Sequence, residues 1–427
     1  MIPRLLAIAL LLCAPLAVAP VHAADLVVPP GAQWSPQFDV ATATDAWIQT
    51  LPAEQRAKSD AYFEGGYWLQ LWNLLWGFGV AALLLMRGRA RRLREWTERI
   101  FRRRWLQNLL YATAYLSLSQ LLGLPLLVYQ GWYRERAYGL STQTFLPWFG
   151  EQALGFVLGT VVGAAFIAAI YALVRRMGRH WWIWATGLAS VFGLMMLAIA
   201  PVFVAPLFND YVPLPDGPVR QSLLSLARAN GIPAQDIYRF DASRQTTRIS
   251  ANVSGVMGTM RISLNDNLLD QTSLPEIRHV MAHEMGHYVL NHIWRDLVYY
   301  SVLALGTFFL LHRLFEFALS RWGPACGVAD FADIAGLPLA MALLSAVLFV
   351  ATPLFNTISR QAEAEADLFG VNAAREPQAM ASVSMRLSTY RKISPGPVEE
   401  FLFFDHPGGR ARVNMAMQWL KENPPGP

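Results

Sequence analysis

The chain has 427 residues, of which 54% are hydrophobic and only 15% are charged. An ordinary soluble protein carries about 25% charged residues, and here the deficit is concentrated in long apolar runs. This composition excludes an ordinary soluble domain and predicts an integral membrane protein. The formal net charge of +5 comes mostly from arginines at the ends of the apolar runs, which indicates membrane topology and excludes a nucleic-acid-binding surface.

The first 24 residues carry a targeting pattern. Arg4 precedes an apolar run from Leu5 to Val18, and the small-residue stretch Val21-His22-Ala23 follows. This pattern is typical of a cleaved signal peptide, and it also fits a first membrane span. On the sequence alone both interpretations stay open.

Six further runs are long and apolar enough to cross a bilayer, for which about 20 residues suffice. They lie at residues 65–86, 105–133, 152–174, 181–208, 297–319 and 334–359. The fifth is interrupted by Arg313 and Glu316, which are three residues apart and can pair with each other or face a polar interior. The sequence therefore predicts a polytopic α-helical membrane protein with six or seven transmembrane helices. No matching pair of broken spans indicates the inverted repeats of a transporter.

The most specific motif is His283-Glu284-Met285-Gly286-His287, which has the H-E-x-x-H pattern. On a helix, residues i and i+4 share a face, so both imidazoles can reach one metal ion. Glu284 follows the first histidine and can serve as the general base of a zinc peptidase. The alternative is a buried helix with two unrelated histidines. Apolar residues on both sides of the motif are what a buried metal-binding helix requires.

A catalytic zinc site usually has three protein ligands, so one more ligand is needed. The two cysteines, Cys13 and Cys326, provide neither a disulfide framework nor a thiolate zinc site. The candidates are His279, His292, His406 or a carboxylate. His279 and His292 lack the usual ligand spacing, and we expect them to be ordinary helix-surface or interfacial histidines.

The better candidates for the third ligand are acidic residues just after the sixth apolar run. Glu363 and Asp367 are four residues apart on one helical face, so one can bind zinc while the other accepts a hydrogen bond from a ligand histidine. Glu365 falls on another side of that helix. The alternative is a solvated acidic face. Three acids directly after a membrane span are unusual, because arginine or lysine is more common there.

With these residues the sequence resembles the CAAX prenyl protease type 1 family, which are multi-span zinc peptidases of the gluzincin class. The family pairs H-E-[LM]-G-H with a later helix carrying E-[FY]-x-A-D. Here the second motif reads Glu363-Ala364-Glu365-Ala366-Asp367, with alanine in place of the aromatic residue. The resemblance extends over about residues 58–419. It implies one zinc ion per chain, held by His283, His287 and Glu363.

A second resemblance concerns substrate binding. The segment from Ser250 to Gly255 resembles the N-A-x-x-[TS]-G edge strand of the family, with serine where the family has asparagine. The alternation from Arg261 to Leu264 predicts a strand, and an exposed edge beside the metal can bind an extended peptide. A plain hairpin is the alternative. The candidate substrate-binding residues are Ser250, Ala251, Asn252 and Gly255.

Near the end of the chain, Asp405-His406-Pro407 and Arg412 resemble the [SD]-H-P-x-x-x-x-R element of the family. The resemblance implies that His406 stabilises the oxyanion, that Arg412 pairs with acids near the site, and that Asp367 orients a ligand histidine. The alternative is a helix start, with Asp405 as N-cap and proline in the first turn.

Arginines indicate the orientation in the membrane. They follow the first run at positions 87, 89, 91, 92, 94, 99, 102, 103 and 104, and the third run at positions 175, 176 and 179. The positive-inside rule assigns both loops to the cytoplasm. Counting spans then predicts a periplasmic H-E-x-x-H helix, whereas the family resemblance implies that the site faces the cytosol.

The sequence therefore predicts a membrane-embedded zinc metalloendopeptidase in a bacterial inner membrane. Residues 25–207 form the membrane domain, and residues 208–427 form a mainly α-helical zinc-peptidase domain with a small β edge. The expected partners are membrane lipid and a peptide or protein substrate, lipidated if it resembles the C-terminal C-a-a-X peptides of the family, and no nucleic acid. The alternative is a non-proteolytic conduit or quality-control protein with a structural zinc. Such a zinc is closed by four ligands and has no use for Glu284.

Overall fold

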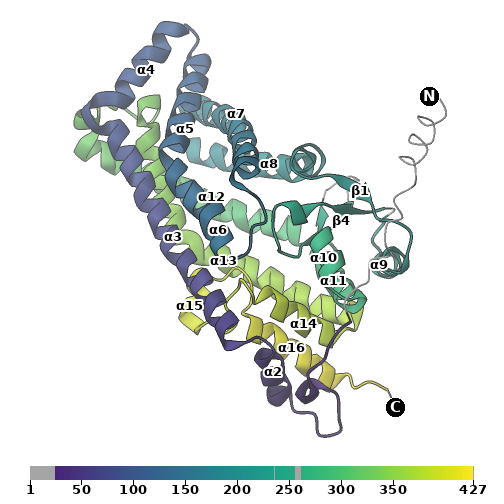
Figure 1. Cartoon of the computed structure of the whole chain (residues 1–427). Helices are drawn as coiled ribbons and strands as arrows, with labels where there is room; N and C mark the ends of the chain where they lie inside the picture. Colours follow the sequence, from purple (N-terminus) through teal and green to yellow (C-terminus); the bar gives the residue numbers. More distant parts are fainter. Residues whose placement is uncertain (1–24, 235, 255–260, 427) are drawn as a thin grey trace, which may run out of the picture.

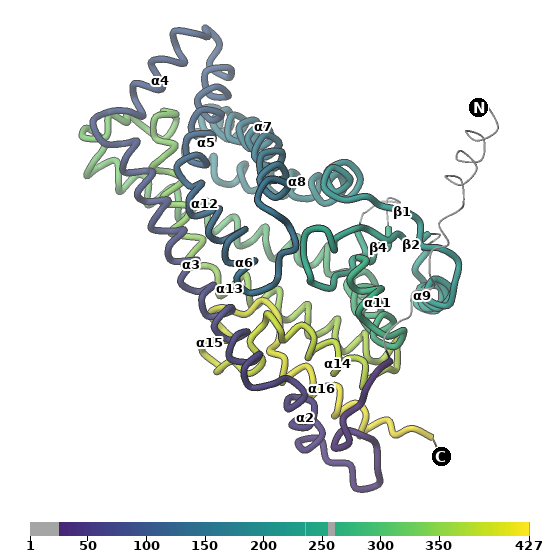
Figure 2. Tube along the Cα trace, in the orientation of Figure 1, coloured from purple at the N-terminus to yellow at the C-terminus, as the bar shows by residue number. Residues whose placement is uncertain are grey.

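The computed structural model describes residues 25–234, 236–254 and 261–426 (Figure 1). The predicted signal peptide or first span at residues 1–24 and the candidate residue Gly255 lie outside these ranges. Long helices form an elongated body with α4 (Arg89–Ile100) at one end. A small sheet and the shorter helices gather toward the other end, as the tube in Figure 2 also shows.

In the described residues, five apolar helical runs are long enough, by length and composition, to cross a membrane. They are Ala53–Ile100, Arg104–Ala137, Phe145–Leu207, His292–Cys326 and Ile334–Ala374. The third run contains both α7 (Phe145–Met177) and α8 (Trp181–Ile199), which are separated at Gly178, where φ is +52°. The six predicted spans correspond to these runs, and the polytopic helical fold is confirmed.

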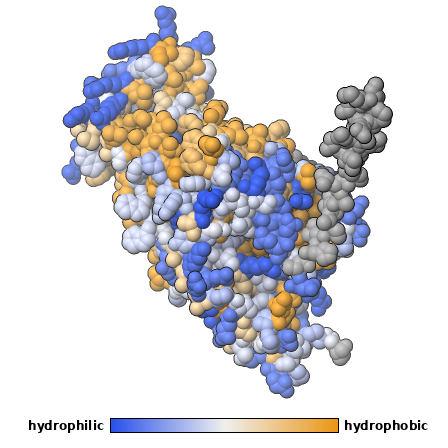
Figure 3. Space-filling model, viewed as in Figure 1, coloured by the Kyte–Doolittle hydropathy of each residue, from blue (hydrophilic) through white to orange (hydrophobic). Residues whose placement is uncertain are grey.

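Large apolar side chains remain exposed on the long helices. Trp68 on α3 (Ala53–Leu85) is 65% exposed, and Val350 on α13 (Leu337–Ala374) is 77% exposed. In Figure 3 these helices form an apolar band between the hydrophilic tip at α4 and the more hydrophilic opposite end. Such a band is expected to contact the hydrocarbon core of a membrane, because a soluble protein rarely exposes a large contiguous apolar surface.

Two membrane-spanning runs contain irregular helix near their C-terminal ends. In α5 (Arg104–Val128) Pro125 precedes a π-helical turn, Tyr129–Tyr133, and α6 follows at Arg134–Ala137. A second π-helical turn, Ala200–Val204, follows α8. Proline inside a helix removes a backbone hydrogen bond, and π-helical turns are common where a helix is distorted.

A four-stranded mixed sheet follows the membrane helices. Its strands are β1 (Tyr211–Pro213), β2 (Ile237–Phe240), β3 (Ala251–Ser254) and β4 (Arg261–Asn265). Their order is β1-β2-β4-β3; β2 and β4 are parallel, and the two other pairs are antiparallel. The strand predicted at Arg261–Leu264 is therefore confirmed, and β3 lies at one edge of the sheet. The sheet packs against α9 (Pro218–Ala229), α10 (Asp266–Gln271) and α11 (Leu274–Val289).

The last part of the chain is helical. It contains α14 (Pro377–Leu387), α15 (Pro397–Phe403) and α16 (Gly409–Glu422). A second core joins α14 and α16 to the N-terminal helix α2 (Val40–Gln49). The fifth membrane run contains α12 (His292–Cys326), where Arg313 pairs with Glu316 at 3.4 Å as the sequence suggested.

The start of α11 is fixed by a buried carboxylate. Ser273 caps the helix, and Glu276 closes the capping box while remaining 0% exposed. Its oxygens also accept from Ser382 Oγ and Arg386 Nε on α14, both at 2.7 Å. Burial by itself raises the pKa of Glu276, but the bonds from Arg386, Ser273 and Ser382 outweigh it and hold that pKa below its ordinary value.

Replacing this carboxylate should destabilise the protein in a pH-dependent way. A folded-state pKa below the unfolded one adds stability above the unfolded pKa and loses it as the pH falls through the folded pKa. We expect Glu276→Gln to cost about 2 kcal/mol at pH 7, with the difference from wild type shrinking as the pH falls below about 4.5. Thermal unfolding in detergent, followed by tryptophan fluorescence, measures this. The exposed Glu54→Gln is the control, and equal losses in both variants would contradict the prediction.

Candidate active site

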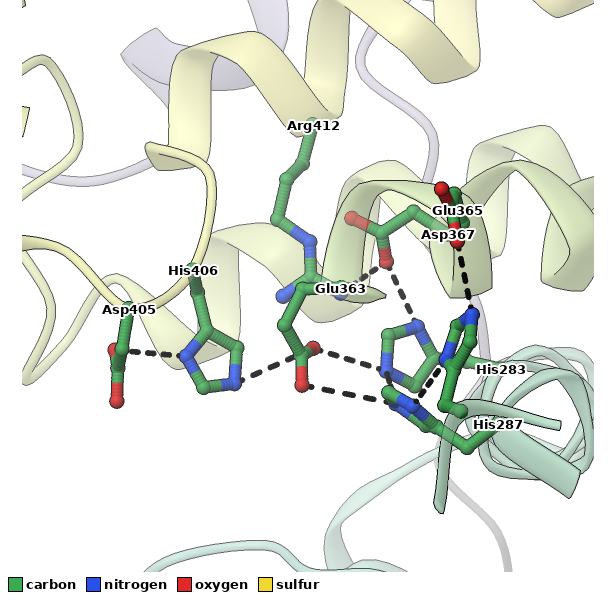
Figure 4. Close-up of polar contacts among 9 residues, drawn as sticks. His283, His287, Glu363, Glu365, Asp367, Asp405, His406 and Arg412 are labelled. Carbon is green, nitrogen blue, oxygen red and sulfur yellow. Dashed lines mark hydrogen bonds and ion pairs between the residues drawn. The ribbon is translucent and has the colours of Figure 1, made fainter. Parts of the chain in front are cut away.

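Three side chains that the sequence singled out as metal ligands converge between α11 and α13 (Figure 4). Nε2 of His283 lies 3.2 Å from a Glu363 oxygen, and Nε2 of His287 lies 3.6 Å from the other oxygen. The two Nε2 atoms are 3.3 Å apart. Two nitrogens and one carboxylate within 4.8 Å of one another form a candidate site for a metal ion.

Close packing of α11 on α13 makes this convergence possible. A Cβ atom at Gly370 would lie 3.0 Å from the backbone nitrogen of His283, and one at Gly286 would lie 3.0 Å from the Phe369 ring. Both contacts are tighter than ordinary van der Waals separation. Glycine at these two positions therefore lets the helices approach until ligands from both can share one ion.

A hydrogen bond at Nδ1 fixes the orientation of the His283 ring. Its Nδ1 donates to Asp367 at 2.9 Å, and Arg412 from α16 donates to the same carboxylate. Asp367 is 0% exposed and Arg412 only 7%. Because Nδ1 carries the proton, Nε2 presents a free lone pair toward Glu363. The structure thus brings Asp367 and Arg412 into the contacts that the resemblance implied.

The ring of His287 has a partner that the sequence analysis missed. Its Nδ1 lies 2.9 Å from Nδ1 of His292, whose Nε2 donates to Glu365 at 3.0 Å. His292 is therefore the acceptor, and Nε2 of His287 is free to bind a metal. The chain reverses at Asn291, where φ is +55°, and this brings the first residue of α12 back against α11.

His279 is 1% exposed and lines the cavity beside the candidate metal ligands. Of the two places expected for it, the helix surface is excluded and an interfacial position remains. Burial lowers the pKa of its ring to about 3, which keeps it neutral. His292 is likewise buried, at 2% exposure.

The electrostatics of the cluster favour a cation. Burial opposes a charge on His283, but Asp367 and Glu363 outweigh it and raise its pKa to about 10. Burial, together with the neighbouring His283, lowers the pKa of His287 to about 4. Glu363 and Asp367 therefore stabilise positive charge at the His283 ring, and a divalent ion bound by Nε2 would take the place of the proton there.

Glu284 has the properties of a general base. It lines two cavities that adjoin the candidate metal ligands, and burial raises the pKa of its carboxyl to about 7. A base works best when its pKa lies near the operating pH. This shift has a clear physical cause, because water is excluded around the charged form.

His406 belongs to the loop between α15 and α16. Its Nε2 lies 3.3 Å from Glu363, and its Nδ1 donates to Asp405 at 2.8 Å. The cap of α16 is Gly408, so the alternative interpretation of Asp405 as an N-cap is wrong. The ring instead reaches the metal cluster from the opposite side to α11, as Figure 4 shows.

Two cavities adjoin the ligands and the edge strand. One, here called the metal cavity, has a volume of about 230 Å³ and is lined by the ligands, Ser250, Ala251 and His406. The other, here called the apolar cavity, has about 600 Å³ and extends from Glu284 and Val253 between α8 and α12. Asn252 lies on β3 opposite Ser263.

Comparison with known proteins agrees with this geometry. Residues 41–210 match the family described as CAAX prenyl protease N-terminal, five membrane helices, and residues 213–420 match peptidase family M48. The uncharacterized metalloprotease YhfN of Bacillus subtilis (strain 168) is 29% identical over 345 residues, which is 80% of each chain. A CAAX prenyl protease 1 homolog of Oryza sativa subsp. japonica is 28% identical over 71% of each chain.

A solved structure shows the same fold. The crystal structure of S. mikatae Ste24p superimposes with a TM-score of 0.72 at 21% identity, covering 86% of this chain and 89% of that chain. Fold and site together define a multi-pass membrane metalloprotease. The chain belongs to the peptidase M48 family, that of CAAX prenyl protease 1, and the resemblance inferred from its motifs is confirmed.

The partner of His287 gives a prediction for metal binding. Without His292 the tautomer of His287 is no longer fixed, and removing such a partner typically weakens metal binding 10- to 100-fold. We expect about a tenfold loss of affinity in His292→Ala, measured by competition with a chromophoric chelator. The control is His180→Ala, at an exposed position between α7 and α8. An unchanged affinity in His292→Ala would rule out the positioning role.

Proposed function

We propose that this metalloprotease is a zinc endopeptidase, with one zinc ion per chain held by His283, His287 and Glu363. Ligands at about 2.0–2.2 Å in a tetrahedral arrangement stand roughly 3.3 Å apart, and the donor separations of 3.2, 3.3 and 3.6 Å fit this geometry. Histidine nitrogen and carboxylate oxygen suit zinc, and three protein ligands leave one position open. The half-buried Glu284, which lines the cavity beside this open position, is the observation that carries the proposal.

When bound, zinc supplies Lewis-acid polarisation of the scissile carbonyl and of the hydrolytic water. Glu284 takes a proton from that water and passes it to the amine nitrogen as the C–N bond breaks. His406 approaches the cluster from the far side and would donate to the oxygen that becomes negative. Asp367 holds His283, and Arg412 balances the charge of Asp367.

The substrate we propose is an extended peptide on β3, paired through its main chain with Ser250, Ala251 and Asn252. An edge strand beside the metal cavity supports this arrangement. The apolar cavity between α8 and α12 would take a large apolar side chain or a lipid group on the peptide. A lipidated peptide therefore fits the site, and a prenyl group is one such lipid.

The mechanism separates metal binding from turnover. We expect Glu284→Ala to keep one zinc per chain and to lose at least about 100-fold in kcat. Glu363→Ala should lose the metal as well as activity, and a chelator should abolish wild-type activity until zinc is restored. Cleavage of a peptide library in detergent, read by mass spectrometry, and zinc content by elemental analysis are the measurements. An active Glu284→Ala enzyme would exclude this role, and zinc without any cleavage in wild type would favour the non-proteolytic alternative.

We further propose a bacterial inner membrane with the arginine-rich end in the cytoplasm. Glu363 lies 26 residues beyond the start of α13 at Leu337, so the metal site is roughly 39 Å from that end of the helix. Helix α4 packs near the start of α13, through the salt bridge of Arg94 with Asp333 at 2.7 Å. The positive-inside rule therefore assigns the candidate metal site to the periplasmic side of the membrane. The family resemblance implied a site that faces the cytosol.

Thiol labelling decides the orientation. In a chain whose two natural cysteines are replaced by serine, Asp216→Cys near the sheet and Glu95→Cys on α4 give single thiols at side chains that are 86% and 41% exposed. We expect an impermeant reagent to label Asp216→Cys in spheroplasts and Glu95→Cys only after the membrane is opened. The reverse pattern would exclude a periplasmic site and admit cytosolic prenylated substrates.

A further inference from the structure

A third cavity continues the cleft on the side away from the apolar cavity. It has a volume of about 600 Å³ and is here called the polar cavity. The metal cavity shares Glu284 and His287 with the apolar cavity, and it shares Ser250, Tyr390 and Arg391 with the polar cavity. The metal ligands therefore lie between an apolar and a polar chamber, and β3 begins where the polar chamber starts.

The polar cavity is lined by two cationic side chains and one anionic side chain, Arg248, Arg391 and Asp405. Arg248 is already paired with Glu135 at 2.7 Å, and Asp405 is held by His406 at 2.8 Å. The next residue along, Lys392, is bound to Glu64 at 2.6 Å and to Glu399 at 2.8 Å. In the described part of the chain Arg391 forms no ion pair, and Asp405 on the same cavity wall acts on it only at longer range.

Arg391 is also only partly exposed, so water compensates its charge incompletely. Its nearest aromatic neighbour, Tyr390, has its ring centroid 6.0 Å from the guanidinium carbon, at the limit of a cation–π contact. A guanidinium is planar and matches a carboxylate with two parallel hydrogen bonds. An unpaired arginine that faces both the metal cavity and the polar cavity is therefore placed to bind an anionic group of a bound peptide.

We propose that Arg391 binds a carboxylate of the peptide substrate, on the side of the scissile bond opposite the apolar cavity. This rests on the proposed peptidase function and assigns to it a residue that determines substrate specificity. The carboxylate is either the C-terminus or an Asp or Glu side chain, because both present the same two oxygens to the guanidinium.

Paired peptides test this. Each pair is identical except that a C-terminal carboxylate is replaced by an amide, or an Asp or Glu near the cleavage site is replaced by Asn or Gln. For wild type we expect neutralisation in at least one pair type to raise KM about tenfold or more, with kcat little changed, because a charge-assisted hydrogen bond is lost. Whichever pair type shows the effect identifies the source of the carboxylate.

The variant Arg391→Gln should remove this discrimination, so that acid and amide peptides have equal KM values near that of the amide in wild type. Arg391→Lys should restore part of the preference. Arg228→Gln, an exposed arginine at the end of α9 that lines none of the three cavities, is the matched control and should behave as wild type. A merely structural role for Arg391 predicts equal losses for acid and amide peptides, and that result would overturn the proposal.

The test also separates this inference from the peptidase function. Wild type that cleaves acid and amide peptides of both pair types with equal KM would overturn the carboxylate site and leave the peptidase intact. If wild type cleaves no peptide, the same peptide pairs are labelled with a fluorophore, and their binding to Glu284→Gln protein is measured by fluorescence anisotropy. Tighter binding of the acid form by Glu284→Gln, and loss of this preference in the double variant Glu284→Gln/Arg391→Gln, would support the carboxylate site. Equal binding of both peptide forms would overturn it.

Discussion

The close contact of α11 with α13 is the constraint on which the rest of the site depends. Two ligands come from one helix and the third from another that is also a membrane span, so their separation is set by how near the helices lie. Gly286 and Gly370 leave no side chain between the backbones, and Gly370 faces His283 itself. Since interiors are close-packed and do not yield by small amounts, a methyl group at either position would separate the donors.

The buried carboxylates near the contact of α11 with α13 require cationic groups beside them. Asp367 is fully enclosed and needs compensation, which Arg412 and His283 supply. Glu363 faces His283, His287 and His406, and the first two can share a cation with it. An uncompensated buried charge is very costly, so a divalent ion bound among these groups would stabilise the packing of the helices as well as supply the chemistry. A buried carboxylate is compensated in the same way at the start of α11, where Arg386 pairs with the charge of Glu276.

Features with a local period were predictable from the sequence. The apolar runs, the i and i+4 spacing of His283 with His287 and of Glu363 with Asp367, and the strand at Arg261–Leu264 all follow from helix or strand geometry alone. What was missed depends on chain reversals. The role of His292 appears only because Asn291 turns α12 back onto α11. The exposure of Arg391 to the metal cavity depends on β3 and α14 lining that cavity together. The spacing of residues along the sequence predicts neither of these tertiary contacts.

The position of the metal site along α13 links membrane insertion to substrate choice. The helix has 38 residues and is roughly 57 Å long, whereas the hydrocarbon core of a bilayer is about 30 Å thick. The ligand-bearing part of α13 therefore extends beyond the apolar layer while its first turns remain anchored in it. The apolar cavity between α8 and α12 faces the membrane helices, and the polar cavity lies toward α14 and the loop before α16. A peptide bond would reach the candidate metal ligands most readily when the residue on one side remains in the apolar layer and the residue on the other side is solvated.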